Sequence, residues 1–125
     1  MLKIRRWLLL IGLLCVPAIV LRACIGIRHT VDNLLYNNYK HYLPCEQLPT
    51  RQEVDRVLEE HADAVAQIKA VHPGFVTVTP AEDLCPHSGL ADILILFASH
   101  QDRIAIETIL NDDRFFGIPY RLINT

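Results

Sequence analysis

The N-terminal apolar run constrains this chain most. Residues Trp7 to Leu21 are fifteen uncharged, mostly apolar residues that follow the basic Lys3, Arg5 and Arg6. A basic stretch followed by an apolar stretch is the pattern of a segment that directs a chain into or across a membrane. Because the basic residues stay on the cytoplasmic side, the rest of the chain is predicted to lie outside the cytoplasm, in the periplasm or at the cell surface.

The length of the run is compatible with either cleavage of the segment or its retention in the membrane. A helix of fifteen residues is about 22 Å long, shorter than the roughly 30 Å hydrocarbon core, which favours a cleaved signal peptide. If the helix continues through Arg22 to Ile27 it reaches about 31 Å, with Arg22 extending to the interface, which favours a retained membrane anchor. Residues 1–27 are therefore predicted to be a signal sequence or an anchor.

The end of the run suggests a third possibility, which is lipidation. Leu21-Arg-Ala-Cys24 resembles the lipobox of bacterial lipoproteins, in which Leu stands three residues before a Cys and a small residue directly before it. The resemblance implies that Cys24 is lipidated and becomes the mature N-terminus. Arg22 stands where that family has a small or uncharged residue. Lipidation at Cys24, plain cleavage and retention thus remain alternatives.

Two cysteines remain beyond this segment, Cys45 and Cys85. A pair in an oxidising compartment predicts a disulfide rather than two buried free thiols. Closing a loop of forty residues would stabilise the fold by about 4 kcal/mol on the chain-entropy argument.

Charge excludes one class of partner. Removing the first 23 residues removes four of the twelve basic residues and none of the fourteen acidic ones, which changes the formal net charge from -2 to -6. Nucleic-acid binding depends on clustered Lys and Arg, and the remaining chain has no such cluster. We expect no nucleic-acid partner, and membrane contact only through the N-terminal segment.

Residues 28–49 are predicted to be a linker, and residues 50–125 a folded domain. Apolar residues between Arg28 and Leu43 allow a short amphipathic helix, and prolines then interrupt the chain. Thr50-Arg-Gln-Glu53 is a capping box, and apolar residues at helical spacing follow it until Pro73 and Gly74.

Three strands and a second helix complete the domain. Residues 75–79 alternate and predict a strand, and residues 91–98 are apolar on both faces, which predicts a central strand. Ser99 to Asp102 form a second capping box that opens a helix ending near Asn111. Residues 117–123 predict a third strand, which Pro119 confines to an edge of the sheet.

The predicted fold class is α+β. The element order gives an αββαβ two-layer domain with a three-stranded mixed sheet and two helices on one face, the last two strands being parallel. This layout is similar, in element order, to the small αββαβ modules of bacterial envelope proteins such as the BON domain. A shared fold does not determine function.

Catalytic motifs are weak. Asp83, Cys85 and His87 alternate in a loop, but a zinc site needs three or four ligands and Cys85 has a predicted disulfide partner. Ser99 is better explained as a helix cap than as a nucleophile. We therefore predict no catalytic residues, no metal, no cofactor and no enzymatic activity.

A partner-binding surface is the remaining hypothesis. Arg and aromatic residues, which interfaces favour, gather near the C-terminus at Arg114, Phe115, Phe116, Tyr120 and Arg121. An alternative surface, expected on a different face, is the acidic part of the first helix, which contains Glu59, Glu60 and Asp63.

Three functions fit these observations. The first is an envelope-anchored, non-enzymatic domain that binds a partner protein as a scaffold or accessory module. The second is an immunity-type inhibitor of a toxic enzyme outside the cytoplasm, and the third is a small hydrolase or metal binder.

Overall fold

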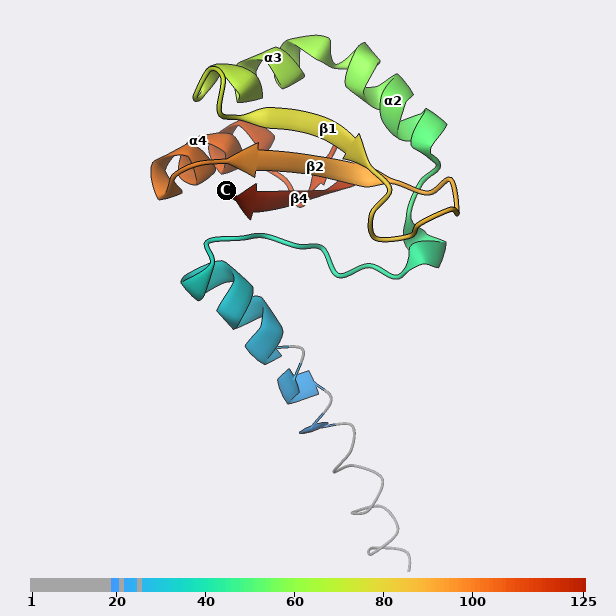
Figure 1. Cartoon of the computed structure of the whole chain (residues 1–125), viewed down its shortest axis with the longest axis vertical. Coiled ribbons are helices and arrows are strands. Elements are labelled where there is room, and N and C mark those ends of the chain that lie inside the picture. The colour runs from blue at the N-terminus through green and yellow to red at the C-terminus, as the bar shows by residue number, and fades with distance from the viewer. Residues whose placement is uncertain (1–18, 21, 25) are drawn as a thin grey trace, which may run out of the picture.

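The computed structural model describes residues 19–20, 22–24 and 26–125, which form an α+β domain preceded by a helical stretch (Figure 1). Most of the apolar N-terminal run lies outside these residues. In the described part, no helix combines the length and the hydropathy that crossing a membrane requires.

The sheet has four strands in the order β1-β2-β4-β3. β1 (Thr77–Ala81) pairs antiparallel with β2 (Asp92–Phe97), and β2 pairs parallel with β4 (Ile118–Asn124). β3 (Arg114–Phe115) pairs antiparallel with β4. The mixed sheet and the parallel crossover between the last two long strands are as the sequence predicts.

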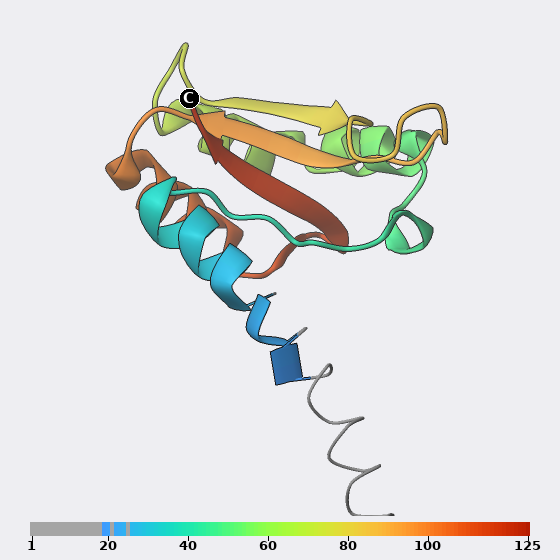
Figure 2. The same ribbon diagram turned by 60° about the horizontal axis from the view of Figure 1, so that its bottom comes forward.

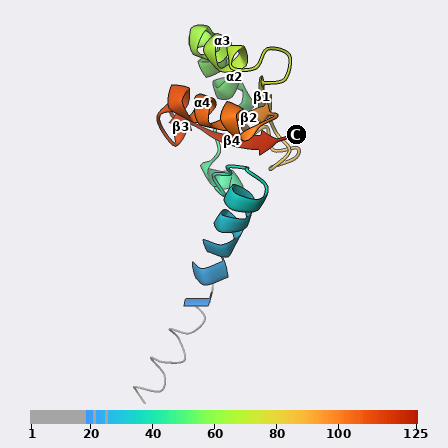
Figure 3. The ribbon, with the colours of Figure 1, turned by 90° about the vertical axis from the view of Figure 1, so that its left-hand side faces the viewer.

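The domain that begins near residue 50 contains three α-helices. They are α2 (Arg51–Glu60), α3 (Ala62–Ala70) and α4 (His100–Leu110). Both predicted caps are present, because the Thr50 side chain accepts a hydrogen bond from the Glu53 amide and Ser99 accepts one from the Asp102 amide. The helices pack on the strands and on one another (Figure 3).

The prediction of two helices is wrong, because the predicted first helix is two helices and the N-terminal helical segment adds another. The break falls at His61, whose backbone (φ -114°, ψ 36°) leaves the helical region. A straight helix of twenty residues would be about 30 Å long, whereas a five-residue strand spans about 17 Å. The break lets both halves stay close to the sheet.

The prediction of three strands is also wrong, because β3 adds a fourth and covers one end of β4. β4 is therefore not a free edge. Pro119 is tolerated because it precedes Tyr120, the first β4 residue paired with β2, so that part of the ladder does not need its missing N–H.

The core lies between the sheet and the helices. On β2, Ile93, Ile95 and Phe97 are fully buried, whereas the alternating Leu94 and Leu96 are only partly covered. Strand side chains alternate between the two faces, so the fully buried set marks the helix-covered face.

The predicted linker packs along the domain. Residues 26–30 are helical and lead into the π-helical turn η1 (Val31–Leu35), and residues 38–48, called the strap below, run past β4 (Figure 2). Tyr39 and Leu122 exchange backbone hydrogen bonds of 2.8 and 2.9 Å. The strap therefore occupies part of the outer edge of β4, before the 3₁₀ turn η2 (Cys45–Gln47).

Candidate partner-binding surface

The turn between β3 and β4 has an unusual backbone. Phe115 pairs with Ile118, and the two residues between them, Phe116 and Gly117, both have positive φ (49° and 91°). Such turns favour Asn-Gly or Gly-Gly, because positive φ brings the Cβ of an ordinary residue too close to the backbone. A phenylalanine in this conformation is an outlier, and its side chain is 56% exposed.

The Phe116 ring is held by a histidine from another part of the chain. The rings of Phe116 and His61 stack with centroids 3.5 Å apart and planes inclined by 4°. Phe115 meets Phe116 edge to face, with centroids 4.9 Å apart. His61 occupies the break between α2 and α3, so this break supplies the ring on which the turn rests.

A small groove of about 230 Å³ opens beside the turn, where α3 and the end of α4 approach β3. Ala64, Ile109 and Leu110 give it apolar walls together with the two phenylalanines. Its volume is below the range of about 300 to 1,000 Å³ usual for small-molecule sites, so it suits a single side chain of another protein. Its polar lining residues are Gln67, Asp112 and Arg114.

The acidic residues of the alternative surface flank the same place. Glu59, Glu60 and Asp63 are all exposed and lie within two residues of His61. Glu60 is paired with Arg56 at 2.7 Å, which leaves Glu59 and Asp63 without an ion pair among the described residues. Glu59 and Asp63 therefore flank, along the chain, the histidine on which the Phe116 ring stacks. We call Phe116, His61, Glu59, Asp63 and the groove beside them the tip surface.

Two of the predicted aromatic contacts are inside the domain. Phe115 is 3% exposed and Tyr120 is 4% exposed. The Tyr120 hydroxyl donates to the backbone oxygen of Asp112 at 2.8 Å, and burial raises the pKa of this hydroxyl. Both side chains belong to the core, so of the five residues predicted near the C-terminus only Arg114 and Phe116 are exposed.

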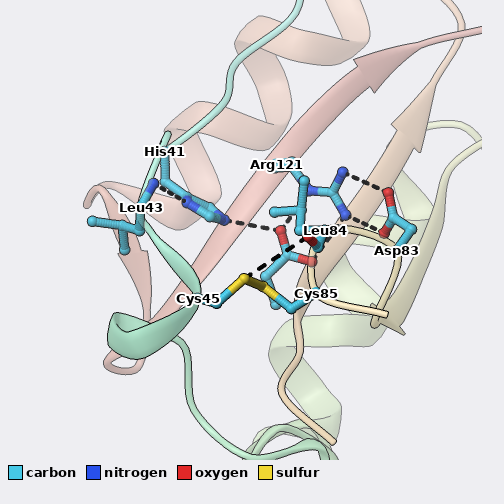
Figure 4. Close-up of polar contacts among 8 residues, drawn as sticks. His41, Leu43, Cys45, Asp83, Leu84, Cys85 and Arg121 are labelled. Atoms are coloured by element: carbon cyan, nitrogen blue, oxygen red, sulfur yellow. Dashed lines mark hydrogen bonds and ion pairs between the residues drawn. A yellow bond between two sulfur atoms is a disulfide. The ribbon is translucent and has the colours of Figure 1, made fainter. Parts of the chain in front are cut away.

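Arg121, in the middle of β4, is also buried, in a network of charges (Figure 4). Its Nε donates to Asp92 at 2.5 Å, and its two terminal nitrogens donate to Asp83 at 3.0 and 2.6 Å. Burial lowers the pKa of Arg121, but the hydrogen bonds to Asp83 and Asp92 outweigh it and raise that pKa. The same guanidinium lowers the pKa of Asp83.

His41 joins this network from the strap. Its Nδ1 accepts from the Leu43 amide at 3.0 Å, so the ring proton lies on Nε2, which donates to Asp92 at 2.9 Å. Both ring nitrogens are occupied, and neither is available as a general base. The network therefore fixes the strap to the sheet. The sequence did not indicate His41 as a partner of Asp92, although an aspartate opening an apolar strand is a signal that it has a buried partner.

A disulfide between Cys45 and Cys85 ties the strap to the loop between β1 and β2, which confirms that prediction. The pocket of about 410 Å³ beside it is lined by both cysteines, His41 and Arg121. Asp83 pairs with Arg121 and Cys85 is in the disulfide, so two of the three loop residues considered as metal ligands already have partners. Among the described residues, no group of three or more His, Cys, Asp or Glu side chains is placed to hold a metal.

Cys24 is exposed in the helical stretch and forms no disulfide within the part of the chain that the structure describes, and its lipidation stays a prediction. Comparison of the chain with protein-family models, with curated proteins and with solved structures gives no match. The proposals below therefore depend on the geometry of the chain itself.

Proposed function

We propose that this protein is an extracytoplasmic, membrane-anchored domain that binds a partner protein through the tip surface. The apolar run after the basic N-terminus supports the anchor. The disulfide agrees with an oxidising compartment.

One observation carries the binding site: Phe116 is an exposed aromatic residue in a backbone conformation that suits Asn or Gly. Residues held in unfavourable backbone regions concentrate at functional sites, where the surrounding structure maintains them. If stability alone mattered, Asn would serve this turn better. The cost of keeping Phe here is explained if the ring contacts another protein.

The chemistry of the tip surface describes the partner. Phe116 and the groove offer apolar contacts, and aromatic anchors of this kind dominate the energetics of many interfaces. Glu59 and Asp63 add negative charge beside them, which would attract a basic partner and orient it. We therefore propose a partner that presents an apolar side chain next to Lys or Arg.

The experiment is site-specific photo-crosslinking with the full chain in its membrane. A photoreactive phenylalanine analogue at position 116 should capture a partner. The matched control is the same analogue at Phe75, which is 60% exposed and whose ring lies 4.5 Å from that of His72, yet is not in the tip surface. Equal capture at both positions, or none at 116, would contradict the proposal.

A second candidate, inhibition of a toxic enzyme outside the cytoplasm, is favoured by the acidic side of the tip surface. The captured partner decides between the two. A basic enzyme whose activity falls when the domain is added would indicate an inhibitor, and a structural envelope protein would indicate a scaffold or accessory module.

A further inference from the structure

The cavity beside the disulfide has the size of a small-molecule site. Its volume is about 410 Å³, within the range of about 300 to 1,000 Å³ that is usual for such sites. Its wall comes from the helical stretch before η1, the strap, the loop between β1 and β2, and β4. Figure 4 shows four parts of this wall, which are His41, Leu84, Arg121 and the disulfide. The fold therefore builds the cavity from segments that are far apart in the chain.

Much of this wall is apolar. Leu43 and Pro44 of the strap, Leu84 of the loop and the disulfide all contribute to it. Leu84 is 43% exposed, so part of this apolar side chain is available for contact. An apolar wall with a few polar groups is typical of small-molecule sites.

The Asp, Glu, Lys and Arg residues of the wall are all basic. The described residues that line the cavity include Arg28, Lys40 and Arg121, and none of them is Asp or Glu. By contrast, the groove of the tip surface includes Asp112, and two cavities beside η1 include Asp32. The whole chain has fourteen acidic and twelve basic residues, so a wall with three basic residues and no acidic one departs from its average. Such a wall suits an anion.

Arg28 is the basic residue of this wall that is free to bind an anion. Lys40 pairs with Asp32 at 3.0 Å, and Arg121 is paired within the buried network. Arg28 is exposed and forms no ion pair with the part of the chain that the structure describes. An arginine guanidinium binds carboxylate and phosphate groups through two parallel hydrogen bonds, which gives Arg28 a ligand preference.

The strap has an unfavourable backbone conformation at this cavity. Tyr42, which lines the cavity, has a φ of 53°. Residues other than Gly rarely adopt this left-handed conformation. The contacts around it maintain it, because the Tyr42 hydroxyl donates to Asp32 and the Leu43 amide donates to the ring of His41. Residues held in this way concentrate at functional sites.

We propose that the cavity binds a small amphipathic anion, which is a carboxylate or phosphate group joined to an apolar body. Arg28 binds the anionic group, and Leu43, Leu84 and the disulfide contact the apolar body. The anion is either a soluble molecule or the headgroup of a membrane lipid, since Arg28 follows the apolar run by seven positions, which is about 10 Å of helix. The site shares no residue with the tip surface and does not depend on its partner.

The test is equilibrium dialysis of the full chain in nanodiscs of neutral phosphatidylcholine, with empty nanodiscs as the background. The probes are the fluorescent naphthoate anion and its neutral amide, naphthamide, which have nearly the same shape. Naphthoate should bind at least about tenfold more tightly than naphthamide, because an ionised acceptor strengthens the hydrogen bonds of an arginine. Equal binding of the two probes, or no binding of naphthoate, would overturn the proposal.

Two pairs of variants assign the roles of the wall. Arg28→Gln should remove the advantage of naphthoate and leave the binding of naphthamide unchanged. Its control is Arg56→Gln, at an exposed arginine of α2 that is outside the cavity. Leu84→Asn should weaken the binding of both probes about fivefold, whereas Phe75→Asn, at an exposed side chain outside the cavity, should weaken neither. An unchanged preference for naphthoate in Arg28→Gln, or an equal loss in Arg56→Gln, would contradict the site.

Nanodiscs that contain anionic phosphatidylglycerol identify the source of the anion. A lipid headgroup in the cavity would displace both probes, whereas the negative charge of the membrane by itself repels only naphthoate. Loss of naphthamide binding therefore assigns the ligand to the membrane, and unchanged naphthamide binding assigns it to a soluble anion. Both results support the site and differ only in the source of the ligand.

Discussion

Replacing Phe116 with Asn should separate binding from stability. Phe116 has a φ of 49° and precedes Gly117. Asn tolerates this left-handed conformation and forms, with the following Gly, the preferred sequence of such turns. The substitution therefore removes the exposed ring and relieves the backbone at the same time.

The expected change in stability is small because two effects oppose each other. Relief of the left-handed backbone should stabilise the turn by about 1 to 2 kcal/mol. The ring is 56% exposed, so its partial burial contributes about 1 kcal/mol. Its stack on His61 contributes about 0.5 to 1.5 kcal/mol. The free energy of unfolding of Phe116→Asn should thus lie between about 0.5 kcal/mol above and about 1.5 kcal/mol below that of the wild type.

Two comparisons sharpen the measurement. Phe116→Ala loses the same ring without gaining the Asn preference, so it should be about 1 kcal/mol less stable than Phe116→Asn. Phe115→Ala empties a core position that is 3% exposed, so it should cost about 3 to 5 kcal/mol. Chemical denaturation of the disulfide-intact protein gives all three values.

The binding assay decides the role of the ring. Phe116→Asn should bind the captured partner at least about 2 kcal/mol more weakly, as an aromatic anchor does, while Phe75→Asn should bind as the wild type does. A Phe116→Asn protein that binds normally would refute the tip surface. A stability loss of about 3 kcal/mol or more would instead place the ring among core residues.

Three further outcomes follow from the buried network and the disulfide. Arg121→Leu should cost about 3 to 5 kcal/mol in denaturant unfolding, because it leaves Asp92 charged, buried and unpaired by an arginine. Replacing Cys45 and Cys85 by Ser should cost about 4 kcal/mol, and an unchanged midpoint would show that the strap is held by its other contacts. Arg121 lowers the folded-state pKa of Asp83, so this carboxylate contributes stability above its unfolded pKa of about 3.9, which is lost as pH falls through the lower folded value. Asp83→Asn should therefore be less stable at neutral pH and lose less stability below about pH 4, and parallel acid titrations of the two proteins would contradict this.

The parts of the fold that could be predicted are those encoded locally. The side chains of Thr50 and Ser99 each accept a hydrogen bond from the backbone amide three residues later in the sequence. Both helices therefore begin where the sequence indicates. The apolar run of β2 on both faces indicates a central strand, and β2 is paired on both sides. The disulfide followed from compartment and cysteine count alone.

The parts that could not be predicted depend on contacts between distant residues. The break at His61 has no Pro or Gly to mark it, and His61 leaves the helical region all the same. β3 has two residues, too few for a periodic pattern. His41 and Asp92 are 51 positions apart, so only the folded chain shows that they meet.

The aromatic and acidic candidates were each identified, but for the same reason the stacking of Phe116 on His61, which stands between the acidic residues in the chain, was not. Their meeting depends on two local irregularities: a helix that breaks without a breaker at His61, and a turn that has Phe where Asn or Gly is preferred. Sequences usually agree with their fold at each local position, and exceptions gather where function requires them. Here both exceptions place their side chains against one another, with ring centroids 3.5 Å apart. Two independent departures that converge on one exposed ring favour a single cause, a surface kept for contact with another protein.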